Sequence, residues 1–198
     1  RMAKNRQPLL KRARTLGIEP GFVGIYKKSK RKPKQNRRKP SNYALQLTEK
    51  QKVKFVYGIL EKQLRRTFAK AEKQSGNVGE NLLVLLERRM DNVVYRLGLA
   101  GTRREAKQLV SHAHFTLNGK KMNIPSATLK VGDVIAVREK SLQSPKFKAL
   151  AENLKGKATP AWLELDANNM TGKIVAMPAR ADVDAPITEQ LIVEFYSR

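Results

Sequence analysis

Apolar residues recur at three- and four-residue intervals through the middle of the chain, a spacing that predicts amphipathic helices. One such helix is expected to carry an apolar face of Leu82, Leu86, Met90, Val93 and Leu97 and to end within residues 98–101. Thr102 and Glu105 then match a capping box, which predicts the start of a second helix. The buried positions of this second helix are expected to be Ala106, Leu109, Val110 and Ala113.

The pattern then changes from helix to strand. Asn118-Gly119 is a strong signal for a two-residue hairpin joining strands 115–117 and 120–122, because both residues tolerate the positive φ of a type I′ turn. A buried strand is expected at 134–138, and two more strands at 162–165 and 173–177. We therefore predict an α+β fold in which two helices pack on a small antiparallel sheet.

Helical spacing also occurs on both sides of this region. Thr48 is expected to cap a long helix that ends near Lys73, with Gly58 marking close packing or a local bend. Downstream, Pro145 is expected at the first position of a short basic helix. Segment 187–196 is predicted to be a helix, with a strand as the alternative.

The charge of the chain is large, positive and uneven. Its 198 residues include 41 Lys or Arg against 17 Asp or Glu, giving a net charge of +24. A surplus of this size implies a polyanionic partner, of which nucleic acid is the commonest and an anionic membrane the rival. From residue 159 onward acids outnumber bases, so that end is not expected to bind phosphate.

Residues 1–40 hold 15 Lys or Arg and a single acid, and we interpret them as a basic arm. Like charges at this density repel one another, so we expect the arm to be disordered until an anion neutralises it. A solvated tail that only aids solubility and a nuclear-targeting patch are the alternative interpretations.

The residue types argue against catalytic and metal chemistry. There are no cysteines, and the two histidines, His112 and His114, point in different directions if they lie on a helix. No phosphate-binding loop or dinucleotide fingerprint appears. We expect a protein that is not an enzyme and needs neither cofactor nor metal. No apolar run is long enough to span a membrane and no secretory signal is visible, so we expect a cytoplasmic protein with no membrane partner.

The central pattern resembles a known domain. Leu86-Glu87-x-Arg89, Val94-Tyr95-Arg96, Thr102, Ala106-Lys107 and Leu109-Val110, followed by Leu117-Asn118-Gly119-Lys120, resemble the helix-turn-helix half and hairpin of the S4 RNA-binding domain. Met90 departs from the usual Leu or Ile, a swap that conserves volume. The flanking patterns Tyr43-x-x-Gln46-Leu47, Tyr57-Gly58, 160–166 and 189–197 resemble the bacterial S4 family of small-subunit ribosomal proteins.

The resemblance implies both an organisation and a function. It implies a basic arm at 1–40, a helical domain at 41–85 joined by 181–198, and an S4 domain at 86–180 with its core at 86–140. A member of that family is expected to bind small-subunit ribosomal RNA directly at a multi-helix junction, to nucleate early assembly, and to lie near messenger RNA beside proteins of the S3 and S5 families. The zinc-binding cysteine cluster of some members has no counterpart here.

Two other functions are the alternatives. One is an RNA-modifying enzyme that uses the motif as an accessory module, which would need a separate catalytic domain for which we expect no room, and the other is an architectural DNA-binding protein, which the composition alone permits. Competition between structured RNA and duplex DNA would separate the second from a ribosomal role.

The residues expected to face RNA are mainly basic. Arg103, Arg104 and Lys107 are the strongest candidates, because the positive end of a helix dipole favours phosphate. The other candidates are Arg88, Arg89, Arg96, Gln108, His112, Lys120 and Lys121 in the motif, Lys30, Arg31, Lys32, Arg37 and Arg38 in the arm, and Lys50 and Lys54 in the long helix. A structural surface role is the alternative for each, and Tyr95 is expected in the core rather than stacked on a base.

Overall fold

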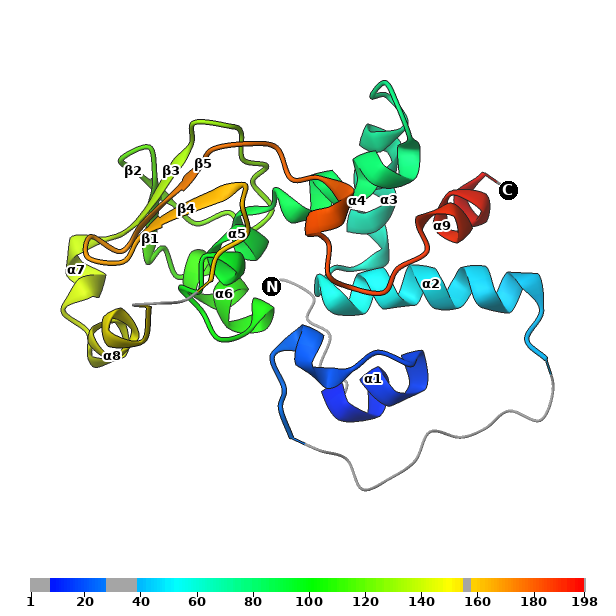
Figure 1. Ribbon diagram of the computed structural model, residues 1–198, viewed down its shortest axis with the longest axis horizontal. Helices are drawn as coiled ribbons and strands as arrows, with labels where there is room; N and C mark the ends of the chain where they lie inside the picture. The colour runs from blue at the N-terminus through cyan, green and yellow to red at the C-terminus, as the bar shows by residue number, and fades with distance from the viewer. Residues whose placement is uncertain (1–7, 28–38, 155–157, 198) are drawn as a thin grey trace. The chain divides into compact units, whose positions relative to one another are not determined.

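The chain forms two compact units in a computed structural model that describes residues 8–27, 39–154 and 158–197. The first unit combines residues 1–83 with 184–198, and the second comprises residues 84–183. The first unit is built from helices, and the second packs helices on an antiparallel sheet (Figure 1). The described part of residues 1–40 therefore groups with the helical unit.

The helical unit draws its elements from both ends of the chain. Its elements are α1 (Leu9–Leu16), η1 (Pro20–Val23), α2 (Asn42–Val56), α3 (Glu61–Ala71) and α9 (Glu189–Tyr196), and α4 (Val78–Glu87) leads from this unit into the second. The C-terminal helix α9 packs against α2, as Figure 1 shows. The helix expected at 187–196 is confirmed.

The single long helix predicted from Thr48 to Lys73 is wrong, because two helices occupy this stretch. Gly58 adopts a φ of 60°, a left-handed conformation that ends α2. The cap is also seven residues earlier than expected, since the Ala44 amide donates to the Ser41 hydroxyl at 3.3 Å. Thr48 lies inside α2 and donates its hydroxyl to the Ala44 carbonyl at 2.7 Å.

The N-terminal segment contradicts the expectation of a disordered arm over residues 8–27. Ala13, Leu16, Ile18 and Val23 are buried there, and α1 packs on α2. Arg12 Nη2 donates to Gln51 Oε1 on α2 at 3.0 Å. A few well-spaced apolar residues are sufficient to hold this segment despite its charge, because their burial is favourable.

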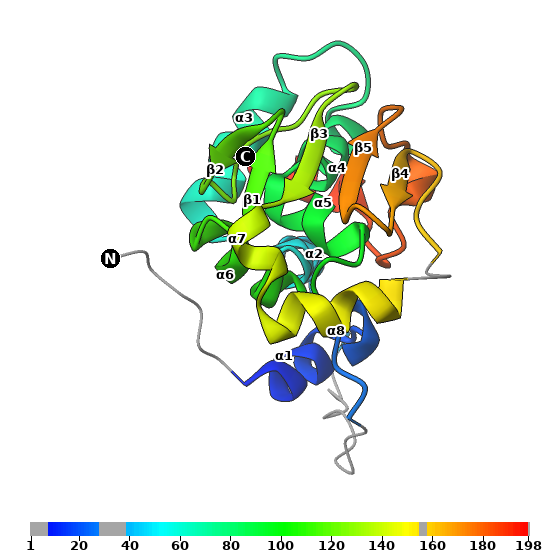
Figure 2. The ribbon, with the colours of Figure 1, turned by 90° about the vertical axis from the view of Figure 1, so that its left-hand side faces the viewer.

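The second unit contains five antiparallel strands and short helices. These are α5 (Met90–Arg96), α6 (Arg103–Ser111), α7 (Glu139–Leu142), α8 (Pro145–Leu154), η2 (Arg180–Asp182), β1 (Phe115–Leu117), β2 (Lys120–Met122), β3 (Val134–Val137), β4 (Leu163–Asp166) and β5 (Thr171–Ile174). The strand order is β2-β1-β3-β5-β4. Figure 2 faces the sheet, with α8 running below it. The predicted α+β class is confirmed.

The hairpin and the sheet core follow from local sequence. Asn118 and Gly119 have φ values of 49° and 77°, as the type I′ turn requires. Phe115, Ile135 and Ile174 are fully or almost fully buried and share one core with α5 and α6. The last predicted strand is displaced, since β5 begins at residue 171 and ends at 174 rather than spanning 173–177.

The helix predicted from Leu82 to Leu97 is interrupted. Arg89 is extended, with φ −68° and ψ 139°, and it bridges to Thr128. Met90 then donates its amide to the Ala127 carbonyl at 2.9 Å. The apolar residues keep their helical spacing across this break because α4 and α5 each bury an apolar side. Only the pairing with residues 127–128 shows that the helix is interrupted.

Candidate nucleic-acid interface

Helix α6 carries a polar face beside a buried one. The predicted capping box is confirmed at Thr102, whose hydroxyl accepts the Glu105 amide at 3.1 Å. The Glu105 carboxylate accepts the Gly101 amide at 2.7 Å, one residue before the expected donor. Hydrogen bonds from the Lys146 side chain and the Gly101 amide outweigh the effect of burial and lower the pKa of Glu105. The cap therefore fixes where α6 begins.

The exposed face of α6 carries Arg104 and Gln108 and continues to the C-cap residue His112, because residues four apart lie on one side of a helix. Lys107 is half-buried beside them. Partial burial lowers the pKa of Arg104, but an arginine remains charged at any physiological pH. Arg104 lies in the first turn, where the helix dipole favours an anion.

The hairpin presents a second group of cations on a rigid element. Lys120 and Lys121 are exposed on β2. Asn118 ties the hairpin tip to the following turn, because its side chain donates to Asp133 Oδ1 and accepts the Val134 amide, both at 2.9 Å. These bonds hold the hairpin tip in place, and Lys120 and Lys121, as neighbours on one strand, project from opposite faces of it.

The turn beside the hairpin contains a cation that the sequence analysis missed. Lys130 is exposed there, and its amide donates to Asp133 Oδ2 at 2.7 Å. Arg88 lies nearby and is half-buried, with its Nε donating to the Leu129 carbonyl at 2.7 Å. Burial lowers the pKa of Arg88, and Asp133 opposes that change. The sequence did not predict that this turn is tied to the hairpin, because the bond that joins them runs from Asn118 to Asp133, 15 residues away.

His114 lies among positive charges at the end of α6. Burial lowers its pKa, and the charges of His112, Lys146 and Arg138 lower it further. Its Nδ1 lies 3.0 Å from the Ser141 hydroxyl. The ring centroids of His112 and His114 are 6.3 Å apart. Within residues 8–27, 39–154 and 158–197, no group of three or more His, Asp or Glu residues is placed to hold a metal ion.

Three arginines predicted to face RNA are instead engaged inside the second unit. Arg89 is 6% exposed and forks onto Asp91, at 3.0 and 2.8 Å. Arg96 binds the buried Glu87 carboxylate at 2.9 and 3.0 Å. Each of these two guanidinium groups neutralises a carboxylate of the protein itself, and their contact with RNA stays a prediction.

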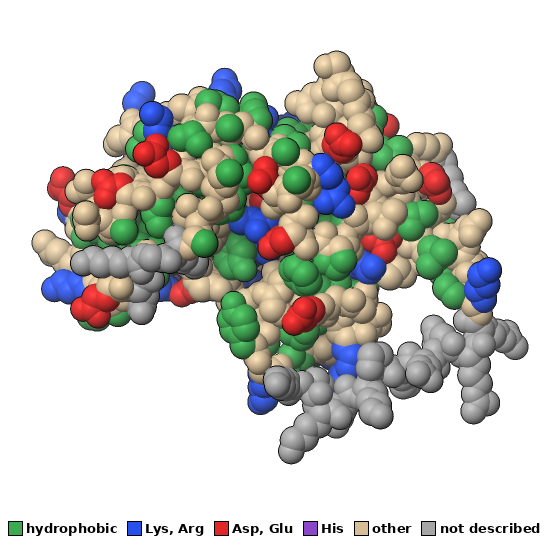
Figure 3. All heavy atoms as spheres, in the orientation of Figure 1, with side chains coloured by type: hydrophobic (Ala, Val, Ile, Leu, Met, Phe, Trp, Pro, Cys, Tyr) green, Lys and Arg blue, Asp and Glu red, His purple; other side chains and the backbone are tan. Residues whose placement is uncertain are grey.

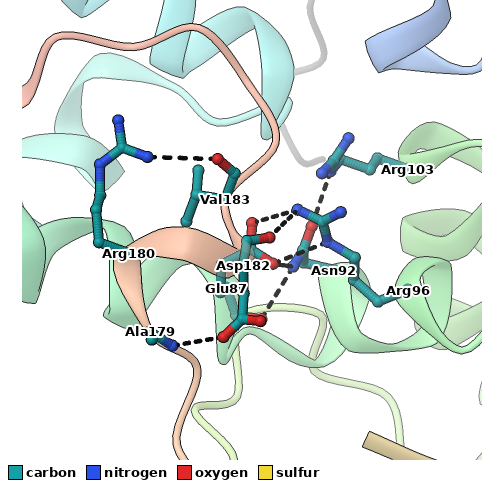
Figure 4. A network of polar contacts seen from close by, with 8 residues as sticks. All are labelled: Glu87, Asn92, Arg96, Arg103, Ala179, Arg180, Asp182 and Val183. Atoms are coloured by element: carbon teal, nitrogen blue, oxygen red, sulfur yellow. Dashed lines mark hydrogen bonds and ion pairs between the residues drawn. The ribbon is translucent and has the colours of Figure 1, made fainter. Parts of the chain in front are cut away.

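Arg103 is the third of these arginines. It is 8% exposed, and its Nε donates to Asn92 Oδ1 at 2.8 Å. Its guanidinium also lies 4.4 Å from the centre of the Tyr95 ring. Figure 4 shows Arg103 pointing toward Asn92 rather than away from the fold. Arg103 is therefore buried, contrary to its expected place on the exposed side of the helix, and its contact with RNA stays a prediction.

The two lysines predicted on α2 also have internal partners. Lys50 and Lys54 contact the two Glu61 oxygens at 3.0 and 2.9 Å, and Lys50 is 6% exposed. Tyr196 on α9 donates its hydroxyl to Glu61 at 2.9 Å. Burial alone would raise the pKa of Glu61, but bonds from Lys54, Lys50 and Tyr196 hold it at about 2. The structure assigns these lysines to the packing of α2, α3 and α9.

Lys50 makes a further contact in the same cluster. Its ammonium lies 4.0 Å from the centre of the Phe195 ring, within the range of a cation–π interaction. Burial, and then the bond to Glu61, raise the pKa of Tyr196, so its hydroxyl remains a donor. A positive charge this well surrounded is not available to a phosphate.

The strands β4 and β5 add little to the candidate surface. On the face shown in Figure 3, basic and acidic side chains of the described residues are scattered among apolar and neutral ones. Glu164, Asp166 and Lys173 are the exposed charges of those strands. The arm candidates Lys30, Arg31, Lys32, Arg37 and Arg38 lie outside the described residues.

The chain matches two family models that meet at the end of α4. The ribosomal protein S4/S9 N-terminal domain matches residues 4–87, and the S4 domain matches residues 88–135. The helix pair α5–α6 and the β1–β2 hairpin lie within the second match, which makes this an S4-domain protein.

Curated relatives extend the match to the whole chain. The small ribosomal subunit protein uS4 of Lachnospira eligens is 52% identical over 197 residues, covering 100% of both chains. The protein of the same name from Acetivibrio thermocellus is 60% identical over 164 residues, which are 83% of this chain and 79% of that one. The chain belongs to the uS4 family of small ribosomal subunit proteins.

Proposed function

We propose that this protein is a structural component of the small ribosomal subunit and that it binds small-subunit ribosomal RNA directly. The observation that supports this is the exposed cationic and polar face of α6, with Arg104, Gln108 and His112, together with Lys120 and Lys121 on the β2 hairpin. Cations held on rigid elements suit the recognition of folded RNA by its phosphates and its shape. The names of the relatives place them in the small ribosomal subunit.

The finer parts of the proposal come from the family resemblance. The RNA target is a multi-helix junction, where early binding nucleates assembly of the subunit. The protein then lies near the entry path of messenger RNA, beside proteins of the S3 and S5 families, on ribosomes in the cytoplasm. Across the described ranges, no helix has both the length and the apolar character needed to cross a membrane.

The two alternative functions are not supported. Neither an accessory module of an RNA-modifying enzyme nor an architectural DNA-binding protein agrees with full-length relatives that are named as ribosomal proteins. Membership of a family of structural ribosomal proteins also places this chain among proteins that are not enzymes.

Equilibrium binding would test the proposal. A fragment of small-subunit ribosomal RNA and a duplex DNA of equal length compete for the protein across a series of salt concentrations. We expect the RNA to bind more tightly, and equal affinity for the two would overturn the ribosomal assignment.

A matched pair of variants tests the surface. Replacing Arg104 and Lys107 with Gln should lower RNA affinity and flatten the salt dependence by roughly 1.4 to 1.8, at about 0.7 to 0.9 for each phosphate contact. Replacing Lys173 with Gln, an exposed residue on the mixed-charge face, should leave the slope nearly unchanged. An unchanged slope in the first variant would refute the assignment of α6 to phosphate.

A further inference from the structure

A buried polar network joins the end of α4 to α5 in the second unit (Figure 4). Glu87, the last residue of α4, is 0% exposed. Its carboxylate accepts from Asn92 Nδ2 at 2.7 Å, from Arg96 Nη2 at 2.9 Å and from Arg96 Nε at 3.0 Å. A buried carboxylate is tolerated only when it is paired and hydrogen-bonded, so these partners are required by the fold.

The network continues from α5 into α6. With its amide nitrogen donating to Glu87, Asn92 presents its carbonyl oxygen to Arg103 Nε, 2.8 Å away. Arg103 is the first residue of α6, and Tyr95 covers its guanidinium at 4.4 Å. A chain of hydrogen bonds therefore runs from a buried acid on α4 to the start of the helix that carries the exposed cations.

The geometry depends on arginine as well as on positive charge. A guanidinium can donate its Nε proton to Asn92 while its carbon lies over the Tyr95 ring, whereas a lysine has a single nitrogen at the end of its side chain and cannot occupy both places at once. Asn92 is buried at 2% exposure, so a lost donor would leave its carbonyl oxygen unsatisfied. Arg104, the next residue, is exposed. Either its guanidinium or the ammonium of a lysine in its place could therefore contact a phosphate.

We propose that Arg103 is a positioning residue for RNA binding, and that the Glu87–Asn92–Arg103 network sets the orientation of α6 and of its exposed face. Arg103 touches no phosphate and acts through Asn92. This inference rests on the proposed RNA binding. It adds that two adjacent arginines have different roles, since Arg103 positions α6 and Arg104 contacts phosphate.

Matched substitutions at the two arginines test the proposal. Binding of each folded variant to small-subunit ribosomal RNA is measured well below its melting temperature, and the active fraction is determined by stoichiometric titration. We expect Arg103→Lys and Arg103→Gln to lose affinity equally, on the order of tenfold, because neither side chain can reproduce the bond to Asn92 together with the contact to Tyr95. We expect Arg104→Lys to bind almost as tightly as the unmodified protein, and Arg104→Gln to flatten the salt slope by roughly 0.7 to 0.9.

The lysine variant at position 103 decides between the two roles. If Arg103→Lys binds like the unmodified protein while Arg103→Gln is weakened, Arg103 is a direct charge contact and the proposal fails. If affinity per active molecule is unchanged in both variants, Arg103 is merely structural and the proposal also fails.

A double-mutant cycle tests whether Arg103 acts through Asn92. Asn92→Ala and Arg103→Lys remove the same hydrogen bond, so the double variant should bind no more weakly than the weaker single variant. Additive losses would show that Arg103 acts independently of Asn92 and would overturn the network. Asn92→Ala also serves in place of Arg103→Lys if the lysine variant does not fold.

Amide hydrogen exchange without RNA separates this inference from the proposed function. Faster exchange at Ala106 to Val110 in Asn92→Ala or Arg103→Lys, with cooperative melting retained, is the expected sign that the network orders α6. Unchanged exchange would refute the network even if RNA binds. Failure of the unmodified protein to prefer ribosomal RNA would refute the proposed function instead, while the exchange result would still decide the role of the network.

Discussion

Glu61 joins three helices of the first unit through one carboxylate, and its replacement by Gln makes a sharp prediction about stability. Lys50 and Lys54 reach it from α2, and Tyr196 reaches it from α9. Glutamine keeps the size of the side chain and one acceptor oxygen but removes the negative charge. The buried Lys50 ammonium would then lack its carboxylate.

The pKa of Glu61 sets the size of the expected loss. Its value of about 2 in the folded protein, against an ordinary value of 4.5, corresponds to an upper bound of about 3.4 kcal/mol at about 1.36 kcal/mol per pH unit. The side chain is 41% exposed, so solvent screens the interaction. We therefore expect Glu61→Gln to lower the free energy of unfolding by about 1 to 2 kcal/mol at pH 7.

The pH dependence of this loss has a definite sign. Because folding depresses the pKa of Glu61, its contribution is complete above pH 4.5 and disappears as the pH falls toward about 2. The difference between the unmodified protein and Glu61→Gln should therefore shrink on acidification through that window.

Urea unfolding followed by circular dichroism measures the effect, since guanidinium would screen the ion pairs. Glu72→Gln, an exposed acid that follows the same helix α3, is the matched control and should change the free energy by less than about 0.5 kcal/mol. A loss in Glu61→Gln that is equal at pH 7 and pH 3, or no larger than that of the control, would refute this account of Glu61.

Two further predictions follow from the N-terminal packing and from the histidine cluster. Leu16→Ala should lower the free energy of unfolding by about 2 to 4 kcal/mol, because Leu16 is buried. Lys11→Ala, on the exposed side of α1, is the control and should change the free energy of unfolding by less than about 0.5 kcal/mol. Equal effects would show that α1 does not pack on the helical unit. RNA binding should raise the pKa of His114, because phosphates offset the charges of His112, Lys146 and Arg138. Affinity for RNA should therefore increase as the pH falls through the pKa that His114 has in the complex. Titration of the His114 ring by NMR, free and bound, measures this, and a pKa that is unchanged or lower in the complex would place the phosphates elsewhere.

Local signals in the sequence predicted local structure well. The Asn118-Gly119 turn and the Thr102 cap depend on conformations and hydrogen bonds within a few residues, so their residue types are sufficient to predict them. The fold class followed from such elements taken together. The interruption at Arg89 was not predictable in this way, because the pairing that holds it comes from Thr128, far along the chain.

The division between exposed and internal cations also depends on distant contacts. Arg96 lies nine residues from Glu87, and Arg103 lies 11 residues from Asn92. The position of these arginines on a helix predicted that they lie outside its apolar face, but it did not predict which polar group each one contacts. The face of α6 that includes Arg104 was predictable because the helical period alone separates it from the buried stripe.

The count of 41 Lys and Arg residues therefore overstates the number of cations available to an RNA. Lys50, Arg89 and Arg96 bind carboxylates of the protein itself, and these acids are as close as any phosphate would be. Breaking such a pair leaves a buried charge uncompensated, so we expect these cations to keep their internal partners when RNA binds. The slope of RNA affinity against salt concentration should then depend on the number of exposed cations such as Arg104. Loss of an internal cation should instead lower the free energy of unfolding or change the orientation of α6.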